Sequence, residues 1–205
     1  MEPEAGASAL ERAFAVTSIV PLGAWLVFHV SDYARVLFGT DEVGATRAVS
    51  PVVIGLELVA VWLPLALHAL FGVGVWLRRR KRPETTPSRK ALVALHRLAG
   101  AALVPFLIDH FVRFRLPILR GERFPSDSVQ VLAAELARTD AGVPWLAAAT
   151  VLGTAGAAFH LGYGLLRCVE RSPRLAGTFA RHLAVGIGLA LGLAGVFAVV
   201  KLATG

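Results

Sequence analysis

Residues 52–77 read VVIGLELVAVWLPLALHALFGVGVWL, an apolar run with only two ionisable side chains, Glu57 and His68. The hydrocarbon core of a bilayer is about 30 Å thick, and a helix of roughly 20 apolar residues crosses it. Lipid cannot hydrogen-bond an open backbone, so a run of this kind must be helical. The sequence therefore predicts a membrane-spanning helix at these residues.

The same pattern recurs along the chain. The 205 residues are 56% apolar, and the mean hydropathy of +0.64 is high for a soluble domain. We expect one all-α domain over residues 1–205, an integral membrane bundle of five transmembrane helices. The expected helices are Arg12–Phe38, Val52–Leu77, Ala91–Leu116, Pro144–Arg167 and Ala176–Val200.

The net charge of +7 is concentrated in two connections. Residues 78–90 carry seven basic side chains, and four arginines lie between residues 167 and 181. The positive-inside rule places both connections in the cytoplasm. The connections 39–50 and 117–143 are acidic or mixed in charge, so they are expected outside. The N-terminus is then cytoplasmic and the C-terminus lies outside.

Four histidines lie deep in four of these segments, and titratable groups at such depth usually mark function. Because helix direction alternates, two of them are expected near the outer face and two nearer the cytoplasm. The expected pairs are His29 with His110, outer, and His68 with His160, inner. Neutral imidazole is a common axial ligand of haem iron. The pattern predicts two bis-histidine haems b, with these four residues as iron ligands in a four-helix diheme core.

Small and basic residues accompany the histidines. Gly72 and Gly164 each follow a histidine by one helical turn, where a missing side chain would leave room for a porphyrin. Ordinary small-residue helix packing explains them equally well. His96 and His182 begin two helices at the cytoplasmic side and are expected at the interface or against a loop. Arg97 is the alternative partner there, for a haem propionate.

The histidine-bearing segments resemble a family. IVPLG at residues 19–23, continuing to Phe28-His29, is similar to the first helix of the cytochrome b558 subunit of succinate:menaquinone oxidoreductase and fumarate reductase. LPLALHALFG at 63–72 resembles the second helix, and FHLGYG at 159–164 the fourth. LHRLAG at 95–100, leading to His110, resembles the third, in which glutamine is more usual at position 96. The likeness covers essentially the whole chain.

This resemblance implies a diheme membrane-anchor subunit in a bacterial cytoplasmic membrane. It would bind an iron–sulfur subunit, and through it a flavoprotein subunit, on the cytoplasmic side. Electrons from succinate would reach menaquinone, and the reverse direction would serve fumarate reduction in the same enzyme class. The dicarboxylate chemistry belongs to another subunit, since this chain has one cysteine and no dinucleotide-binding fingerprint. Some members of the resembled family have a proton-carrying glutamate at the position where this chain has Ala158.

The quinone site is expected on the outer side, where proton-exchanging groups are available. Glu57 is the most unusual of these, because it lies inside an apolar segment. Quinone proton exchange and a structural polar contact are equally good interpretations of it. The full set of outer candidates is Asp32, Arg35, Asp41, Glu42, Glu57, Asp109 and Arg113. For Asp41 and Glu42, a solvated loop is the favoured interpretation.

Two other classes of protein fit parts of the pattern. A quinone-reducing diheme cytochrome b of the hydrogenase or formate dehydrogenase type, or a cytochrome b561, would also bury four histidines. Those folds commonly take two ligands from one helix, whereas here each of four helices supplies one. A haem-free membrane transporter would need no cofactor, and an absorption spectrum separates it from both.

Overall fold

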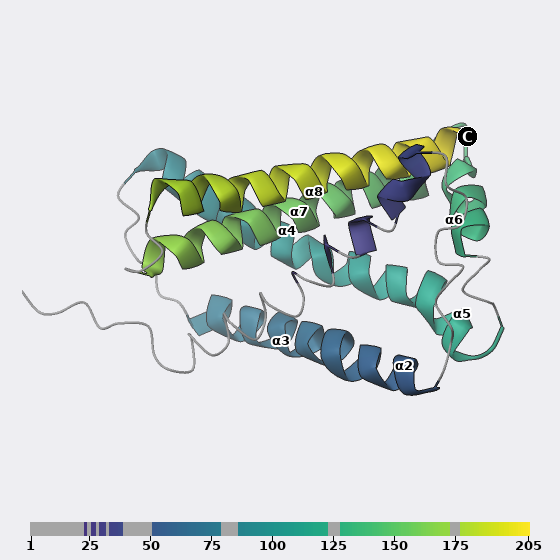
Figure 1. Ribbon diagram of the computed structural model, residues 1–205, viewed down its shortest axis with the longest axis horizontal. Helices are drawn as coiled ribbons and strands as arrows, with labels where there is room; N and C mark the ends of the chain where they lie inside the picture. Colours follow the sequence, from purple (N-terminus) through teal and green to yellow (C-terminus); the bar gives the residue numbers. More distant parts are fainter. Residues whose placement is uncertain are drawn as a thin grey trace, which may run out of the picture.

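The computed structural model describes residues 23, 26–27, 29–31, 33–38, 51–78, 86–122, 128–172 and 177–205. Within these residues the regular elements are helices, and a single isolated bridge joins Asp140 to Val143. Four helices are long and apolar enough to cross a membrane: Ile54–Val73, Pro87–Leu119, Trp145–Glu170 and Thr178–Thr204. The described part of the chain is thus helical, with the character of a multi-pass membrane protein (Figure 1).

The first expected span, Arg12–Phe38, falls largely outside the described residues. Its described part is helical at Gly23 and up to Ala34, and a short 3-10 turn, η1 (Arg35–Phe38), follows. The five-helix count therefore stays a prediction, while four of its helices are present.

Each of the next two spans is one long helix that contains a single π-helical segment. The second span consists of α2 (Pro51–Glu57), the π segment η2 (Leu58–Trp62) and α3 (Leu63–Arg78). The third consists of α4 (Pro87–His110), the π segment η3 (Phe111–Arg115) and α5 (Leu116–Leu119). Such π segments occur frequently at functional sites. Here η3 begins at the residue after His110.

Local sequence explains where the third span begins. The Thr86 hydroxyl accepts a hydrogen bond from the Arg89 backbone N–H at 3.4 Å, and Pro87 occupies the first helical turn. Threonine before a proline is a favourable helix start, because the proline ring fixes φ and its missing N–H is not needed there. The helix therefore begins four residues before the expected Ala91.

The closest helix pair is α7 (Trp145–Arg171) and α8 (Thr178–Thr204), which run side by side in Figure 1. A Cβ atom added to Gly188 would lie 2.9 Å from the Cα of Gly162, so neither position has room for a side chain. Membrane helices pack through small residues in this way, since lipid supplies no hydrophobic drive between them.

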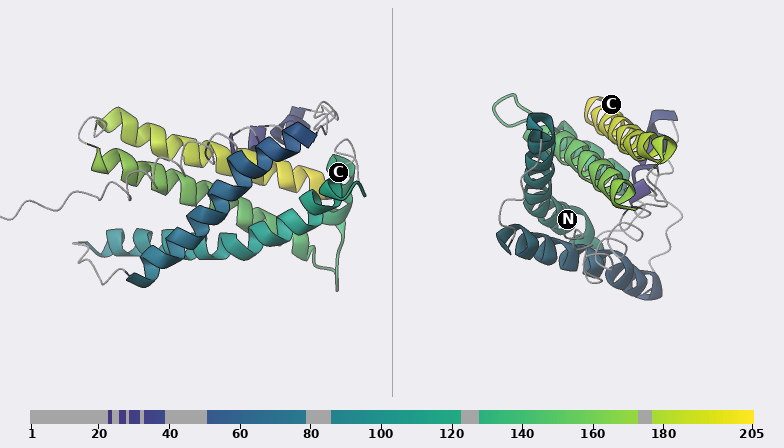
Figure 2. Two further views of the ribbon diagram at one scale, coloured as in Figure 1. Left: turned by 90° about the horizontal axis from the view of Figure 1, so that it is seen from below. Right: turned by 90° about the vertical axis from the view of Figure 1, so that its left-hand side faces the viewer.

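The segment α2–η2–α3 crosses the other helices obliquely (Figure 2). Its backbone makes few close contacts with the other described helices, so it meets them mainly through long side chains. His68 lies on this segment, and side chains fill the space between its helix and α7. The two helices are joined at this level by the ring contacts described below.

A short helix, α6 (Ser128–Ala137), lies within the connection that was expected to be an outer loop. Leu136 is fully buried there and packs in one cluster with Leu132, Ala147, Val199 and Leu202. This cluster places α6 against one end of α7 and α8, beside the C-terminus (Figure 1). The sequence gives little sign of it, because the segment is short and mixed in charge.

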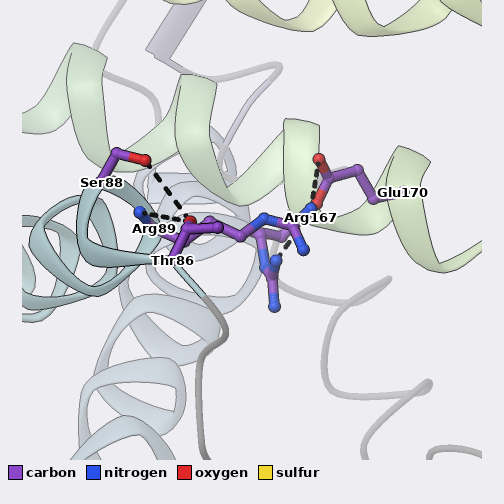
Figure 3. A network of polar contacts seen from close by, with 5 residues as sticks. All are labelled: Thr86, Ser88, Arg89, Arg167 and Glu170. Atoms are coloured by element: carbon purple, nitrogen blue, oxygen red, sulfur yellow. Dashed lines mark hydrogen bonds and ion pairs between the residues drawn. The ribbon is translucent and has the colours of Figure 1, made fainter.

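The opposite end of the bundle carries a polar network (Figure 3). Glu170, near the end of α7, accepts from Arg89 at 3.3 Å and from Arg167 at 3.1 Å. The contact ties the start of α4 to the end of α7. The start of α4 and the end of α7 adjoin the two basic connections that the charge pattern places in the cytoplasm. The contact therefore puts these two connections on the same side of the bundle.

Candidate functional site: two pairs of histidines

The inner pair of histidines comes together across α3 and α7. The ring centres of His68 and His160 are 6.1 Å apart, and the ring planes cross at 84°. Both residues are half-buried. A metal–imidazole bond is about 2 Å long, so imidazoles on opposite sides of one iron have ring centres about 6 Å apart. A pair of imidazoles with this spacing would have room to hold one haem iron between them.

The outer pair comes together in the same way from the first span and α4. The ring centres of His29 and His110 are 5.8 Å apart, with the planes at 83°. Aromatic rings surround this pair: Tyr33 lies 5.0 Å from His29, and Phe114 lies 5.1 Å from His110. Two residue pairs that are 81 and 92 positions apart in the sequence thus have almost the same geometry.

The two pairs lie at different levels of the bundle. Gly100 of α4 lies beside His160, and His110 follows it by ten residues on the same helix. At 1.5 Å per residue this separates the two levels by about 15 Å, half the thickness of a hydrocarbon core. The depth difference expected from alternating helix direction is therefore present in the fold.

His96 of α4 is half-buried, and its described ring contacts are with helix α7 and not with a loop. Its ring stacks on that of His160, with centres 4.1 Å apart and planes within 6°. It also contacts Tyr163 at 5.0 Å. Sequence reasoning missed this contact. The available signal was that His96 and Gly100 lie one turn apart on a single helix face.

The glycines have different surroundings. A Cβ on Gly100 would lie 2.7 Å from Cε1 of His160, so this glycine makes room for the imidazole. A Cβ on Gly164 would come within 3.9 Å of His96, and one on Gly72 would meet no described atom within 4 Å. The structure thus gives Gly72 and Gly164 space on their helices, which is compatible with a flat ligand and with ordinary packing.

Arg97 and His182, which were both expected near the cytoplasmic side, are exposed. Arg97 follows His96 on α4 but has an exposed side chain, and His182 is exposed near the start of α8. Neither is drawn into a histidine pair in the described contacts. A propionate role for Arg97 stays a prediction.

Ala158 precedes His160 by two residues and is 4% exposed. It faces α8, where a Cβ on Gly192 would lie 3.3 Å from the Ala158 Cβ. A longer side chain has no space at this contact. The packing of α7 on α8 thus gives a physical reason for a small residue where some members of the resembled family carry glutamate.

Glu57 has both carboxylate oxygens engaged. Trp62 Nε1–H donates to Oε1 at 2.9 Å, and Arg115 donates to Oε2 at 2.5 Å. The rings of Trp62 and Phe111 are in edge contact at 4.6 Å. These contacts join the π segments η2 and η3, so Glu57 holds the second span against the third. Arg115 was not among the expected residues, because its partner is 58 positions away.

We expect Glu57→Gln to lower the stability of the protein by about 1–3 kcal/mol, between the values typical of exposed and of buried ion pairs. The two side chains are 19% and 24% exposed. The measurement is thermal unfolding in detergent. Glu122→Gln is the matched control, because its pair with Arg120 is 4.0 Å long and well exposed. Unchanged stability would contradict the structural role and favour the interpretation of Glu57 as a proton-exchanging group.

Arg113 lies in the π segment η3, just beyond the end of α4, and makes two kinds of contact. It donates to both oxygens of Asp109 at 2.8 Å, one turn away on the helix. It also lines an open cavity of about 350 Å³. The cavity is lined by Arg113, Glu135, Arg138, Thr139, Asp140, Trp145 and Leu146. Most of these belong to α6 and the turn after it, which sequence reasoning left as a loop.

The remaining outer candidates are placed only in part. Arg35 is exposed at the start of η1. Asp32, Asp41 and Glu42 lie outside the described residues. In the part of the chain that is described, no group of three or more His, Cys, Asp or Glu side chains is arranged to hold a bare metal ion.

Comparison with known proteins finds no family model, no curated protein and no solved structure that matches this chain. Within the described residues, the fold and site define a class: a helical protein with four helices long and apolar enough to cross a membrane, in which four histidines come together as two pairs. Anything more particular has to come from the chemistry of those pairs.

Proposed function

We propose that this chain is a diheme cytochrome b, the membrane-anchor and electron-transfer subunit of a succinate:menaquinone oxidoreductase or fumarate reductase. The observation that carries the proposal is the spacing of the histidines, about 6 Å within each pair and on two levels of one bundle. Helix–helix hydrogen bonding alone gives no reason for two such pairs at matched separation.

The contacts of His160 support ligation through a defined nitrogen. Its Nδ1 lies 3.2 Å from the main-chain oxygen of His96. A carbonyl oxygen only accepts, so Nδ1 carries the hydrogen and the lone pair of the neutral ring is on Nε2. Iron-binding histidines are usually oriented by a hydrogen bond of this type. The four histidines would hold two haems b, and one-electron transfer is the chemistry that the iron supplies when bound.

The two ends of the bundle suit different neighbours. The cytoplasmic end carries the basic connections and the Arg89–Glu170 contact, and would face the iron–sulfur subunit with its flavoprotein. The outer end carries the cavity beside Arg113, which we propose as the menaquinone site. Trp145 and Leu146 offer apolar contact there, and Arg113 and Thr139 offer hydrogen-bond donors to a quinone oxygen.

The proposal is tested by the absorption spectrum of the purified protein. We expect a b-type α band in the reduced-minus-oxidised difference spectrum and two haems per chain by pyridine haemochrome assay. Low-spin signals from both haems are expected in electron paramagnetic resonance, because each iron would have two imidazole ligands. Protein purified after expression with ample haem supply that shows no α band would exclude every cytochrome interpretation and leave the haem-free transporter.

A further inference from the structure

His96 and Gly100 form the part of the α4 surface that contacts the imidazole of His160, here called the His160 seat, and the stacking contact in it was not predicted from the sequence. His96 contributes its ring, which lies flat on that of His160 at 4.1 Å. It also contributes its main-chain oxygen, which accepts from His160 Nδ1. Gly100 contributes the absence of a side chain, since a Cβ there would lie 2.7 Å from Cε1 of the ring.

In the His160 seat, the hydrogen bond to the His96 main-chain oxygen requires the missing side chain at Gly100, because both residues lie on one face of α4. In a continuous helix the main-chain oxygen of His96 already accepts from the N–H of residue 100, one turn later. A carbonyl oxygen has a second lone pair, which is free for the His160 N–H only if the imidazole can approach the helix surface closely. Any side chain at position 100 would stand in that approach.

The stacked ring of His96 lies beside the ligand axis and does not cross it. The Nε2 lone pair of an imidazole lies in the plane of the ring, whereas His96 covers a flat face of that ring. His96 is therefore placed to fix the orientation of His160 without taking the position of the iron. No hydrogen bond within the described residues reaches the buried Nδ1 of His96 itself, so its ring is held there by the stacking contacts with His160 and Tyr163.

We propose that His96 and Gly100 are positioning residues for His160: they fix its tautomer and the plane of its ring, and so set the ligand field of the inner haem. This inference rests on the proposed function. It predicts that substitutions at these two positions affect the inner haem and not the outer one, because the outer pair has other described ring neighbours, Tyr33, Phe106 and Phe114.

The experiment compares Gly100→Ala, His96→Ala and His96→Phe in the purified full-length protein. We expect Gly100→Ala and His96→Ala to shift or abolish the low-spin resonance signal and the midpoint potential of the inner haem, while those of the outer haem are unchanged. His96→Phe retains a flat ring and the main-chain oxygen, so its inner signal should remain close to that of the wild type.

Two controls separate this role from a general loss of structure. Gly186→Ala is a helical glycine on α8 whose new Cβ would meet nothing within 4 Å, and His182→Ala removes an exposed histidine. Both should leave both haem signals unchanged. The inference is overturned if Gly100→Ala leaves the inner signal at its wild-type position, if it alters the outer signal instead, or if Gly186→Ala produces the same shift.

A second measurement does not depend on haem. Nitrogen NMR spectra of the wild-type protein with isotope-labelled histidine should show His160 with its hydrogen on Nδ1. The His160 signal is assigned by its loss in His160→Gln. A hydrogen on Nε2 overturns the inference even where the cytochrome proposal holds. A wild-type protein without haem but with the Nδ1 tautomer overturns the proposed function and leaves the positioning contact intact.

Discussion

Replacement of either histidine of a pair by alanine should remove the same haem. On the proposed diheme function, we expect His68→Ala and His160→Ala each to lose the inner haem and keep the outer one. His29→Ala and His110→Ala should do the reverse. The reason is the geometry: each pair has ring centres about 6 Å apart, and the two pairs are on separate levels. A low-spin haem that loses one of its two protein ligands is no longer held from both sides.

Haem content per chain and a redox titration of each variant measure this effect. Haem content should fall from two per chain to one, and each titration should retain a single component that is shared by both variants of a pair. His182→Ala serves as the control, because that histidine is exposed at the start of α8. Retention of different components in His68→Ala and His160→Ala would break the pairing.

The second prediction concerns the orientation of the chain in the membrane. We expect a cysteine at position 90 to be inaccessible to a membrane-impermeant thiol reagent added to intact cells, and a cysteine at position 122 to react. Lys90 and Glu122 are both exposed side chains at opposite ends of the third span, so the two variants are matched in accessibility. The basis is the run of basic residues between 78 and 90, which the positive-inside rule retains in the cytoplasm.

The labelling experiment uses Lys90→Cys and Glu122→Cys in a Cys168→Ser background, because Cys168 is the single native cysteine. Permeabilised cells provide the control, since both positions should then react. The contact of Arg89 with Glu170 adds a check: the end of α7 must lie on the same side as position 90. Labelling at 90 and protection at 122 in intact cells would mean the opposite orientation.

The hydrophobic pattern determined most of the fold. Apolar runs of membrane length predicted the second to fifth spans, and four membrane-length helices lie at those places. Their ends moved by a few residues, as at Thr86, because capping and helix propensity continue beyond the apolar core. The helix α6 was missed, because its stability comes from burial of Leu136 against α7 and α8, a contact that no local pattern reveals.

For the histidine pairs too, the sequence predicted one part of the arrangement and the tertiary structure decided the rest. Helix direction and residue spacing were enough to predict which histidine lies at the level of which other, because a helix converts sequence separation into depth. Depth along the helix axis does not determine which side chains of neighbouring helices are in contact. The stacking of His96 on His160, the clearance at Gly100 and the Glu57–Arg115 ion pair all depend on how far each helix is rotated about its own axis. Packing fixes that rotation, through contacts such as Gly162 against Gly188, so only the tertiary structure could decide it.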